Sequence, residues 1–509
     1  MLFTPRNPSL HLWDSWLLKQ GEEFHLFHLM KRTGESSSMI NHAISKDLVT
    51  WEEKGPVIER GKPGEWDAGG LNTGITVHHD GKYYMFYGAL VDGVQRIGVA
   101  ISTDLDKWEK YDGSPVLKID PRWYQAEVLD ASEPGVSWRD PCIIEDENGI
   151  FHAFVCARAK TGAWAAKGAI GHATSSDLLS WDVHPPIYVS DRHGFLEVPD
   201  VFRLGDRWFI IFSTGQWHTT RTDDADYAAS GMRYLVGESM LGPYYEPKGS
   251  SLLSTGLGVL GAYAGRSISL EGEDHLMRRM PIGSRLFYYH NAYRTEFLKF
   301  TFKGSWGLPK LLTQDEGRLH LGYYPKVISA IISPETLLLE GEEFSEFYPG
   351  VHGTGIEWDK LGQGLSGYCP GGSAAALTRH KISDGMCQVK VSIASGGAAG
   401  ILFRYDDGSR EGLALTVDVT RQRVELLRVY RAEFGWTSCI EQYRPLAIDC
   451  DKEYMIRVVA RDCFVDAYVD DQAMFSLSVE ANKKGRTGLY LENAKAQFGS
   501  VTVKPIGRR

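Results

Sequence analysis

The sequence lacks the cysteine patterns of a zinc site or a disulfide framework. Its seven cysteines are scattered and none forms a CxxC pair, so a structural metal is not expected. The first residues, MLFTPRNPSLHLWDSW, lack the charged and then apolar segments of a secretory signal. Together with the odd number of cysteines, this predicts reduced thiols and a cytoplasmic location. A secreted form cut from a longer precursor is the alternative.

Long apolar runs and long basic runs are also absent. No stretch of about 18 apolar residues occurs, so no membrane span is expected. The formal net charge is −10 without a long basic run, which argues against a nucleic-acid partner. A neutral ligand fits this charge better.

Glycine and aromatic residues, in contrast, are abundant. The 509 residues include 55 Gly, 24 Tyr and 14 Trp, and the length predicts two or three domains. The composition is typical of many short strands joined by tight turns. It also suits a sugar site lined by aromatic rings, and the two interpretations are compatible.

A repeated unit runs through the first 315 residues. An alternating aromatic strand after a turn begins at Gly21, Gly81, Gly149, Gly205 and Ser284. Three copies continue into a Ser/Thr-x-Asp-Leu-x-x-Trp segment, whose last residues are Trp51, Trp108 and Trp181. Such a unit cannot bury its own apolar face and needs neighbours stacked around an axis. Five copies predict an all-β, five-bladed β-propeller in which these tryptophans pack the blades; a β-sandwich with coincidental hairpins is the alternative.

Strands of a different kind follow the repeats. Residues 371–509 alternate between apolar and polar positions with regular turn signals, which predicts a C-terminal β-sandwich of the jelly-roll or lectin-like kind. Residues 331–370 are rich in glycine and irregular, so a linker is expected there. The predicted domains are thus a propeller over 1–330, this linker, and a sandwich over 371–509. The sandwich could bind glycan, brace the propeller or form a homo-oligomer contact.

Three acidic residues precede the inner strands of the first, third and fourth predicted blades: Asp14, Asp140 and Glu197. Each alone is more often a turn residue. Inner strands converge at one end of a propeller, however, so the three side chains should meet in one funnel. Glycoside hydrolysis needs such a set, because one carboxyl group protonates the leaving oxygen and another attacks the anomeric carbon or activates water. A third carboxylate can bind substrate hydroxyls, and Trp13 and Trp16 could form an apolar sugar platform.

Crowding of these carboxylates has an electrostatic consequence. Like charges held close together raise the pKa of one member, so one group can stay protonated near neutral pH. The predicted funnel could therefore hold both an acid and a nucleophile or base.

The motifs around these acids resemble glycoside hydrolase family 32, and more loosely families 68 and 43, over the N-terminal 300 residues. Trp13-Asp14 is similar to the Trp-x-Asn-Asp-Pro-Asn box, with Trp13 and Ser15 at the Asn and Pro positions. Trp138-Arg139-Asp140-Pro141 matches the Arg-Asp-Pro box. Glu197-Val198-Pro199-Asp200 resembles Glu-Cys-Pro-Asp, with Val198 in place of Cys.

Two further segments extend the resemblance. Leu71-Asn72-Thr73-Gly74 lies where the family has a substrate-contacting turn. Tyr263-Ala264-Gly265-Arg266 resembles a Tyr-Ala-x-Gln element of the fourth or fifth blade. The predicted sandwich also fits the family's layout.

The resemblance implies a retaining hydrolase of β-fructofuranosides, with a disaccharide or oligosaccharide as substrate and hydrolysis or transfer as outcome. Asp14 would be the nucleophile and Glu197 the acid/base, while Asp140 would hold ring hydroxyls. Arg139 would orient Asp140 or contact the substrate. Neither a metal nor a cofactor is implied, since protonation activates the electrophile. The expected substrate-binding residues are Trp13, Trp16, Asn72, Thr73, Arg139, Tyr263 and Arg266.

Two other functions stay open. One is an inverting furanosidase, for example on arabinofuranosides, which needs the two carboxyl groups about 6.5–9.5 Å apart instead of about 5–5.5 Å. The other is a glycan-binding protein on a degenerate propeller, which the altered first box would allow.

Overall fold

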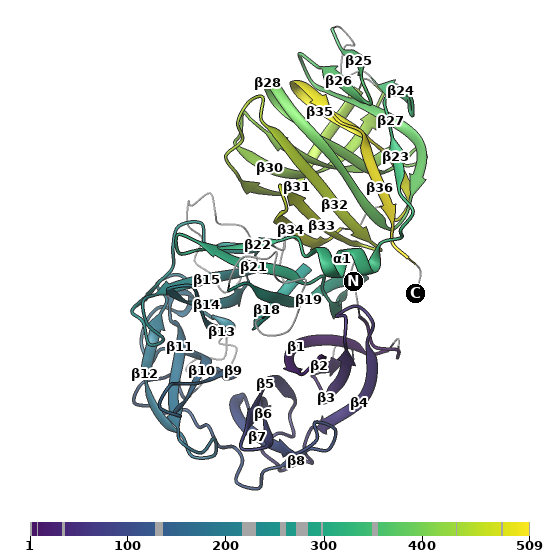
Figure 1. Cartoon of the computed structure of the whole chain (residues 1–509). Helices are drawn as coiled ribbons and strands as arrows, with labels where there is room; N and C mark the ends of the chain where they lie inside the picture. The colour runs from purple at the N-terminus through teal and green to yellow at the C-terminus, as the bar shows by residue number, and fades with distance from the viewer. Residues whose placement is uncertain are drawn as a thin grey trace. The chain divides into compact units, whose positions relative to one another are not determined.

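The computed structural model describes residues 3–7, 9–32, 36–127, 136–215, 231–254, 261–270, 283–296, 299–348, 355–433, 435–479 and 482–507. The chain divides into two compact units, Met1–Leu321 and Gly322–Arg509. Nearly all regular structure is β-strand, which confirms the all-β prediction (Figure 1). No helix in these ranges is long and apolar enough to cross a membrane.

The first unit begins with four blade-like sheets, each antiparallel and in chain order. They are arranged as a propeller with the first strand of each sheet innermost (Figure 1). The strands of the first two are β1 (His11–Gln20), β2 (Glu23–Lys31), β3 (Met39–Ser45), β4 (Glu52–Glu59), β5 (Leu71–His79), β6 (Lys82–Val91), β7 (Val94–Ser102) and β8 (Glu109–Lys110). The next two contain β9 (Trp138–Glu145), β10 (Phe151–Arg158), the short 3-10 helix η1 (Trp164–Ala166), β11 (Gly168–Ser175), β12 (Asp182–Val189), β13 (Glu197–Leu204), β14 (Arg207–Thr214), β15 (Gly231–Gly237) and β16 (Tyr244–Tyr245).

The predicted count of five separate blades is not reproduced, because only four blades are distinct. β15 pairs with both β16 and β17 (Ser251–Ser254), so the fourth sheet continues along the chain without a break. Within this continuation an antiparallel group forms in which β19 pairs with each of its neighbours. Its strands are β18 (Gly261–Ser269), β19 (Arg285–Glu296), β20 (Lys299–Trp306) and β21 (Lys310–Asp315).

The Ser/Thr-x-Asp-Leu-x-x-Trp repeats form the same turn in three blades. In the first, Leu48 has φ 63°, its amide donates to Ser45 Oγ at 2.9 Å, and Asp47 accepts the next two amides. Trp51 Nε1 then donates to the Leu48 carbonyl at 3.3 Å. The turns at Asp104 and Asp177 repeat these bonds. The repeat therefore encodes a turn and a packing tryptophan, as predicted.

A β-bulge interrupts the inner strand of every blade, and β18 has one too. In each case two residues oppose one residue of the partner strand, namely 13–14, 72–73, 140–141, 198–199 and 264–265. Asp140, Val198 and Ala264, at equivalent positions, have φ values of 57°, 51° and 51°. A bulge redirects the side chains next to it. The five bulges thus provide five equivalent places at which side chains can be aimed into the centre.

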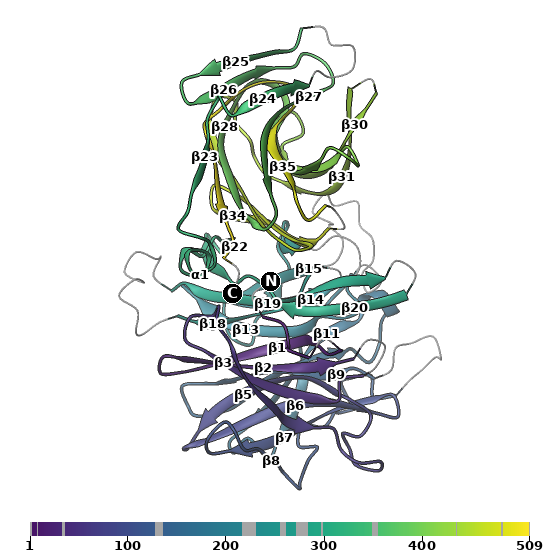
Figure 2. The same ribbon diagram turned by 90° about the vertical axis from the view of Figure 1, so that its right-hand side faces the viewer.

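The second unit is built of antiparallel strands that curve around a large apolar core, with a second, smaller apolar cluster, as expected for the predicted sandwich (Figure 2). After β22 (Arg318–Gly322) and α1 (Pro325–Ile331), its strands are β23 (Leu337–Leu339), β24 (Phe344–Tyr348), β25 (Glu357–Leu361), β26 (Gly364–Tyr368), β27 (Ser373–Ile382), β28 (Gly385–Asp406), β29 (Glu411–Asp418), β30 (Arg423–Ala432), β31 (Gly435–Pro445), β32 (Glu453–Arg461), β33 (Phe464–Val469), β34 (Gln472–Ser478), β35 (Gly485–Phe498) and β36 (Val501–Pro505).

The structure differs from the predicted linker over 331–370. β23 pairs with β36, β24 with β27, and β26 with both β25 and β35. Apart from the short β25–β26 hairpin, these partners lie far along the chain, so the irregular glycine-rich sequence gives little local sign of the strands. The segment belongs to the second unit.

Candidate active site

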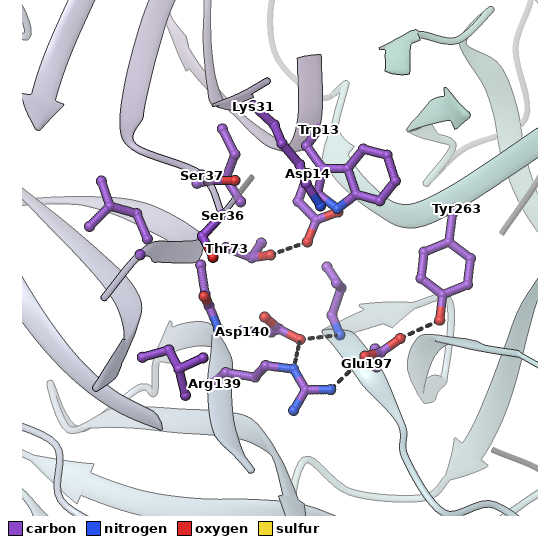
Figure 3. Close-up of a pocket in the computed structure, with 16 residues that line it drawn as sticks. Trp13, Asp14, Lys31, Ser36, Ser37, Thr73, Arg139, Asp140, Glu197 and Tyr263 are labelled. Carbon is purple, nitrogen blue, oxygen red and sulfur yellow. Dashed lines mark hydrogen bonds and ion pairs between the residues drawn. The ribbon is translucent and has the colours of Figure 1, made fainter. Parts of the chain in front are cut away.

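One pocket of about 340 Å³ lies where the inner strands of the first unit meet (Figure 3). It brings together the three acidic residues from separate strands, Asp14 on β1, Asp140 on β9 and Glu197 on β13. Asp14 and Asp140 were predicted to precede their strands, but both strands begin earlier. Five of the predicted substrate-binding residues also line it, namely Trp13, Asn72, Thr73, Arg139 and Tyr263. The site is therefore assembled from the bulges of different blades.

The predicted residues Trp16 and Arg266 do not line this pocket. Trp16 is fully buried, donates from Nε1 to Thr76 Oγ1 at 3.0 Å, and packs against Gly74, where a Cβ would lie 2.8 Å from its ring. Arg266 is 1% exposed and donates to the Pro141 carbonyl at 3.1 Å. Both follow their bulges, where the strand has returned to its regular alternation. They hold inner strands together instead of facing a substrate.

Asp14 is held by groups from two other strands. Thr73 on β5 donates its hydroxyl to Asp14 Oδ2, and His290 Nδ1 on β19 lies 3.4 Å from Asp14 Oδ1. The Asp14 side chain is 15% exposed, so one edge of the carboxyl still reaches the pocket. This carboxyl is both anchored and accessible.

Arg139 links the other two carboxylates. Its guanidinium lies 2.5 Å from Glu197 Oε1 and 3.3 Å from Asp140 Oδ2. Arg139 is fixed in turn by Gln95 Oε1 and Ser137 Oγ, both at 2.9 Å. Glu197 also accepts the Tyr263 hydroxyl on Oε2 (Figure 3). Both Glu197 oxygens therefore have fixed donors.

Asp140 is the most deeply buried of the three acids. Its side chain is 4% exposed, compared with 19% for Glu197, and it accepts the Val198 amide at 3.1 Å. That bond joins the bulge of β9 to the bulge of β13. Asp140 thus couples two blades at the floor of the pocket.

Burial and crowding shift the acidities of this group. Burial, followed by the charge of Asp140, raises the pKa of Asp14 to about 7, although the Thr73 hydrogen bond acts in the opposite direction. Burial also raises the pKa of Asp140, while neighbouring Arg139 opposes the rise. At neutral pH the pocket therefore holds a proton on Asp14 in part of the molecules.

Several pocket residues were not predicted from the sequence. Lys31, at the end of β2, has its ammonium 4.7 Å from the centre of the Trp13 ring, and Ser36 and Ser37 follow on the next connection. Burial lowers the pKa of Lys31, and Asp14 opposes this change. Lys31 pairs with His11, two residues before the first bulge, so the strand pairing of the bulge residues themselves gives no sign of it. In the described ranges no group of three His, Cys, Asp or Glu residues is suited to hold a metal ion.

Comparisons with known proteins bear on this arrangement. Residues 16–249 match the model of the glycosyl hydrolases family 32 N-terminal domain. A levanase of Bacillus sp. (strain L7) is 27% identical over 229 residues, which are 40% of this chain and 22% of the relative. A xylosidase/arabinosidase of Thermoclostridium stercorarium is 24% identical over 178 residues, 31% of this chain and 34% of the relative. The matches thus span about a fifth to a third of these relatives.

The fold has relatives among solved structures as well. Fructan 1-exohydrolase IIa from Cichorium intybus matches with a TM-score of 0.68 and 13% identity, covering 99% of this chain and 97% of that chain. A β-fructofuranosidase of Bombyx mori, described as a family 32 protein, matches with a TM-score of 0.66 and 15% identity over 99% of this chain and 94% of that one. These likenesses show a common fold. The family model matches the blades that carry Asp140 and Glu197, so this part of the chain resembles the N-terminal domain of glycoside hydrolase family 32.

Proposed function

We propose that the protein is a glycosidase that hydrolyses β-fructofuranosides by a retaining, double-displacement mechanism. The observation that carries this proposal is the meeting of Asp14, Asp140 and Glu197, from three blades, in one pocket that also contains Arg139 and Tyr263. A pair of carboxyl groups across a sugar is the equipment of glycoside hydrolysis. The match to the family 32 model and the similarity to a levanase support a fructose-containing substrate.

In this mechanism Asp14 attacks the anomeric carbon as Glu197 protonates the leaving oxygen, so that a glycosyl-enzyme ester forms and the glycosidic bond breaks. Glu197 then takes a proton from water, which displaces Asp14 and releases the sugar. Asp140 accepts hydrogen bonds from ring hydroxyls. Arg139 and Tyr263 orient Glu197 through its two oxygens.

The proton in the pocket has to be on the right acid for this chemistry. The reaction needs Asp14 ionised and Glu197 protonated, whereas burial keeps a proton on Asp14 up to a pKa of about 7. Ionisation of Asp14 must therefore accompany the binding of a neutral sugar. The rate should depend on pH with an acid limb near this value.

A fifth blade is part of the proposal. β18 has the same bulge as the four inner strands before it, and Tyr263 stands at the position that Glu197 and Arg139 occupy in theirs. At the other end, the Trp306 amide donates to the Phe3 carbonyl at 2.9 Å, which ties the end of β20 to the start of the chain. We assign β18–β21 to the fifth blade position of a propeller that lies within the first unit, which ends at Leu321 and not near the predicted residue 330.

A substrate screen tests the proposal. Purified protein is incubated with sucrose, levan, inulin, difructose anhydrides and aryl arabinofuranosides, beside Asp14→Asn and Glu197→Gln variants. Fructose release that falls about 10²–10⁴-fold in Glu197→Gln and is lost in Asp14→Asn is expected. No turnover of any of these compounds, with sugar binding intact, would contradict the enzyme and favour a glycan-binding protein.

The roles of the two acids are separated by leaving group and by azide. Glu197→Ala should keep activity on fructosides whose leaving groups need no protonation, and azide should restore turnover with retained stereochemistry. Asp14→Ala should be inactive even on fructosides whose leaving groups need no protonation. Added azide should then give the fructosyl azide of inverted configuration. The reverse pattern would exchange the two assignments.

An arabinofuranosidase is the second candidate, because a xylosidase/arabinosidase is among the relatives. Arabinose release from aryl arabinofuranosides with no fructose release would favour it. The configuration of the first-formed sugar, read by proton NMR, then distinguishes inversion from retention. Added glycerol tests transfer, since a retaining enzyme can pass the sugar to an acceptor other than water.

A further inference from the structure

His290 is a buried histidine that touches three residues of the pocket without lining it. Its side chain is fully buried on β19, and the cross-strand partner of His290 is Tyr263. The imidazole Nδ1 lies 3.4 Å from Asp14 Oδ1, and the ring centre lies 4.8 Å from that of Trp13 and 6.3 Å from that of Tyr263. Within the described part of the chain neither ring nitrogen has a hydrogen-bond partner.

His290 differs from the residues that face the other four inner strands at the equivalent position. The residues opposite the equivalent position before each bulge are Met30, Ala89, Cys156, Ser213 and His290. The first four are small or apolar groups that pack behind their bulges. A histidine, which requires partners for two nitrogens when it is buried, is costly at such a place unless a polar group next to it needs a donor.

Asp14 is that polar group. Thr73 already donates to Oδ2, so Oδ1 is the oxygen that still needs a donor, and it is the oxygen that faces His290. We propose that His290 is a positioning residue which donates its Nδ1 hydrogen to Asp14 Oδ1 and so holds the carboxylate of Asp14 ready for attack. The inference rests on the proposed function, since it names the support of the proposed nucleophile. The 3.4 Å separation shortens when the carboxyl ionises, as catalytic hydrogen bonds commonly do on substrate binding.

The charges around the pair are compatible with this role. Burial, together with the charge of Lys31 on β2, lowers the pKa of His290 to about 3, so the imidazole is neutral across the working range. Asp14 is faced by Asp140 on β9 and Glu197 on β13, which favour its protonated form. Arg266 on β18 and the Thr73 hydroxyl on β5 act in the opposite direction. A neutral imidazole that donates a hydrogen bond to Asp14 acts in the same direction as Arg266 and Thr73, without adding a charge.

Two substitutions separate the hydrogen bond from the packing. His290→Phe keeps a flat ring against Trp13 and Tyr263 but removes the donor. His290→Asn keeps a donor near the place of Nδ1. The titration of Asp14 is followed by carbon NMR in protein labelled at the aspartate carboxyl carbons, with the signal assigned by its loss in Asp14→Asn.

Loss of a hydrogen bond to a charged group should raise the midpoint of the Asp14 titration in His290→Phe by about one to two pH units. His290→Asn should recover at least half of that shift. The acid limb of kcat/KM should move with the midpoint, so that kcat/KM at pH 6 falls about ten- to a hundredfold, while KM changes less than about threefold. A purely structural role would lower the melting temperature but leave the midpoint in place.

An unchanged midpoint in His290→Phe would overturn the proposal. If that variant does not fold, nitrogen NMR of the wild-type imidazole decides, because a hydrogen on Nε2 with a bare Nδ1 is incompatible with donation to Asp14. The NMR titration needs no substrate. A shifted midpoint in a protein that turns over no furanoside would therefore support the positioning by His290 and contradict the proposed function alone.

Discussion

The carboxyl of Asp14 illustrates how burial and function oppose each other at one residue. A nucleophile has to be ionised, yet the pocket wall raises its pKa to about 7. Thr73, and His290 by our proposal, reduce that cost with two hydrogen bonds. Arg139 and Tyr263 meanwhile hold Glu197 with donors on both oxygens. The protonation of the pocket is therefore set by a few neighbours that can be changed one at a time.

Asp14→Asn should stabilise the fold in a pH-dependent way. The folded protein keeps the Asp14 proton up to about pH 7, while the unfolded chain releases it near the ordinary value of 3.8. Stability is thus lost as the pH rises between these values, and asparagine, which cannot ionise, avoids that loss. At pH 8 relative to pH 4 the variant should gain about 1–4 kcal/mol over the wild type.

Melting temperatures of both proteins across this pH range measure the gain. The exposed Asp112→Asn serves as the control and should show no pH-dependent difference. A constant difference between Asp14→Asn and the wild type at all pH values would show that Asp14 is already ionised in the folded protein.

The residues of the site could be predicted from the sequence only where they lie on a bulge or directly before one. Asp14, Asp140 and Glu197 lie at or near the start of recognisable strands, so their convergence follows from the repeat. Trp16 and Arg266 were expected in the pocket because they lie close to these motifs in sequence. The strands resume their alternation there, so both side chains are buried in the packed interior and not in the pocket. His290 had no motif at all, because it reaches the site through strand pairing with Tyr263.

At the scale of the element, the three Asp-Leu turns show how a short motif encodes geometry. Asp177 accepts the Leu179 and Ser180 amides at 2.8 and 2.7 Å, and Leu178 takes a left-handed conformation at φ 65°. Hydrogen bonds from these amides lower the pKa of Asp177, so the turn is most stable with the carboxylate ionised. The repeat was readable in the sequence because every partner lies within a few residues.

Asp177→Ala should therefore destabilise the first unit by about 1–2 kcal/mol, as loss of a capping carboxylate does. The melting temperature of the variant measures the effect at neutral pH. Asp182→Ala, an exposed aspartate at the start of the next strand, is the matched control and should change stability by less than about 0.5 kcal/mol. Equal effects of both substitutions would contradict a special role of the turn.

At the scale of the whole molecule, polar networks join neighbouring blades. Glu246, which follows β16, lies 2.9 Å from His193 Nε2 and 3.1 Å from Arg192 Nε, both on the segment before Glu197. It also pairs with Arg233 on β15 at 3.2 Å and accepts Ser250 Oγ at 2.6 Å. These partners outweigh the effect of burial and lower the pKa of Glu246 to about 2. The network ties the connection between the third and fourth blades to the outer part of the fourth.

Glu246→Ala should destabilise the protein by about 3–5 kcal/mol, because it removes the carboxylate that pairs with the buried charge of Arg233. The effect should shrink as the pH falls toward 2, since the wild type then loses the same charge. Glu238→Ala removes an exposed glutamate that lies 3.2 Å from Arg207 and should cost less than about 1 kcal/mol. Thermal unfolding at pH 7 and pH 3 measures the stability of the two variants. Equal losses of stability in Glu246→Ala and Glu238→Ala would contradict the role of the network.

Long-range pairing also explains where the prediction of the fold was incomplete. The blades could be predicted because the hydrogen-bond partners within each repeat are close in sequence. In contrast, β23 and β24 form strands only by pairing with β36 and β27. A glycine-rich stretch without alternation was therefore interpreted as a linker. The fourth sheet likewise continues through β17 by a pairing that no local motif announces.

The distribution of the pocket over the inner strands has a consequence for synthesis on the ribosome. Asp14 emerges among the first residues, but Thr73 follows one blade later, and His290 becomes available only when β19 has been made. A nascent chain that stops before β19 can hold every described residue that lines the pocket, the last being Tyr263 on β18, but lacks the histidine behind Asp14. Stalled chains of increasing length should begin to release sugar in one step once β19 has been made. The chain length at which activity appears would then show when the first unit is complete.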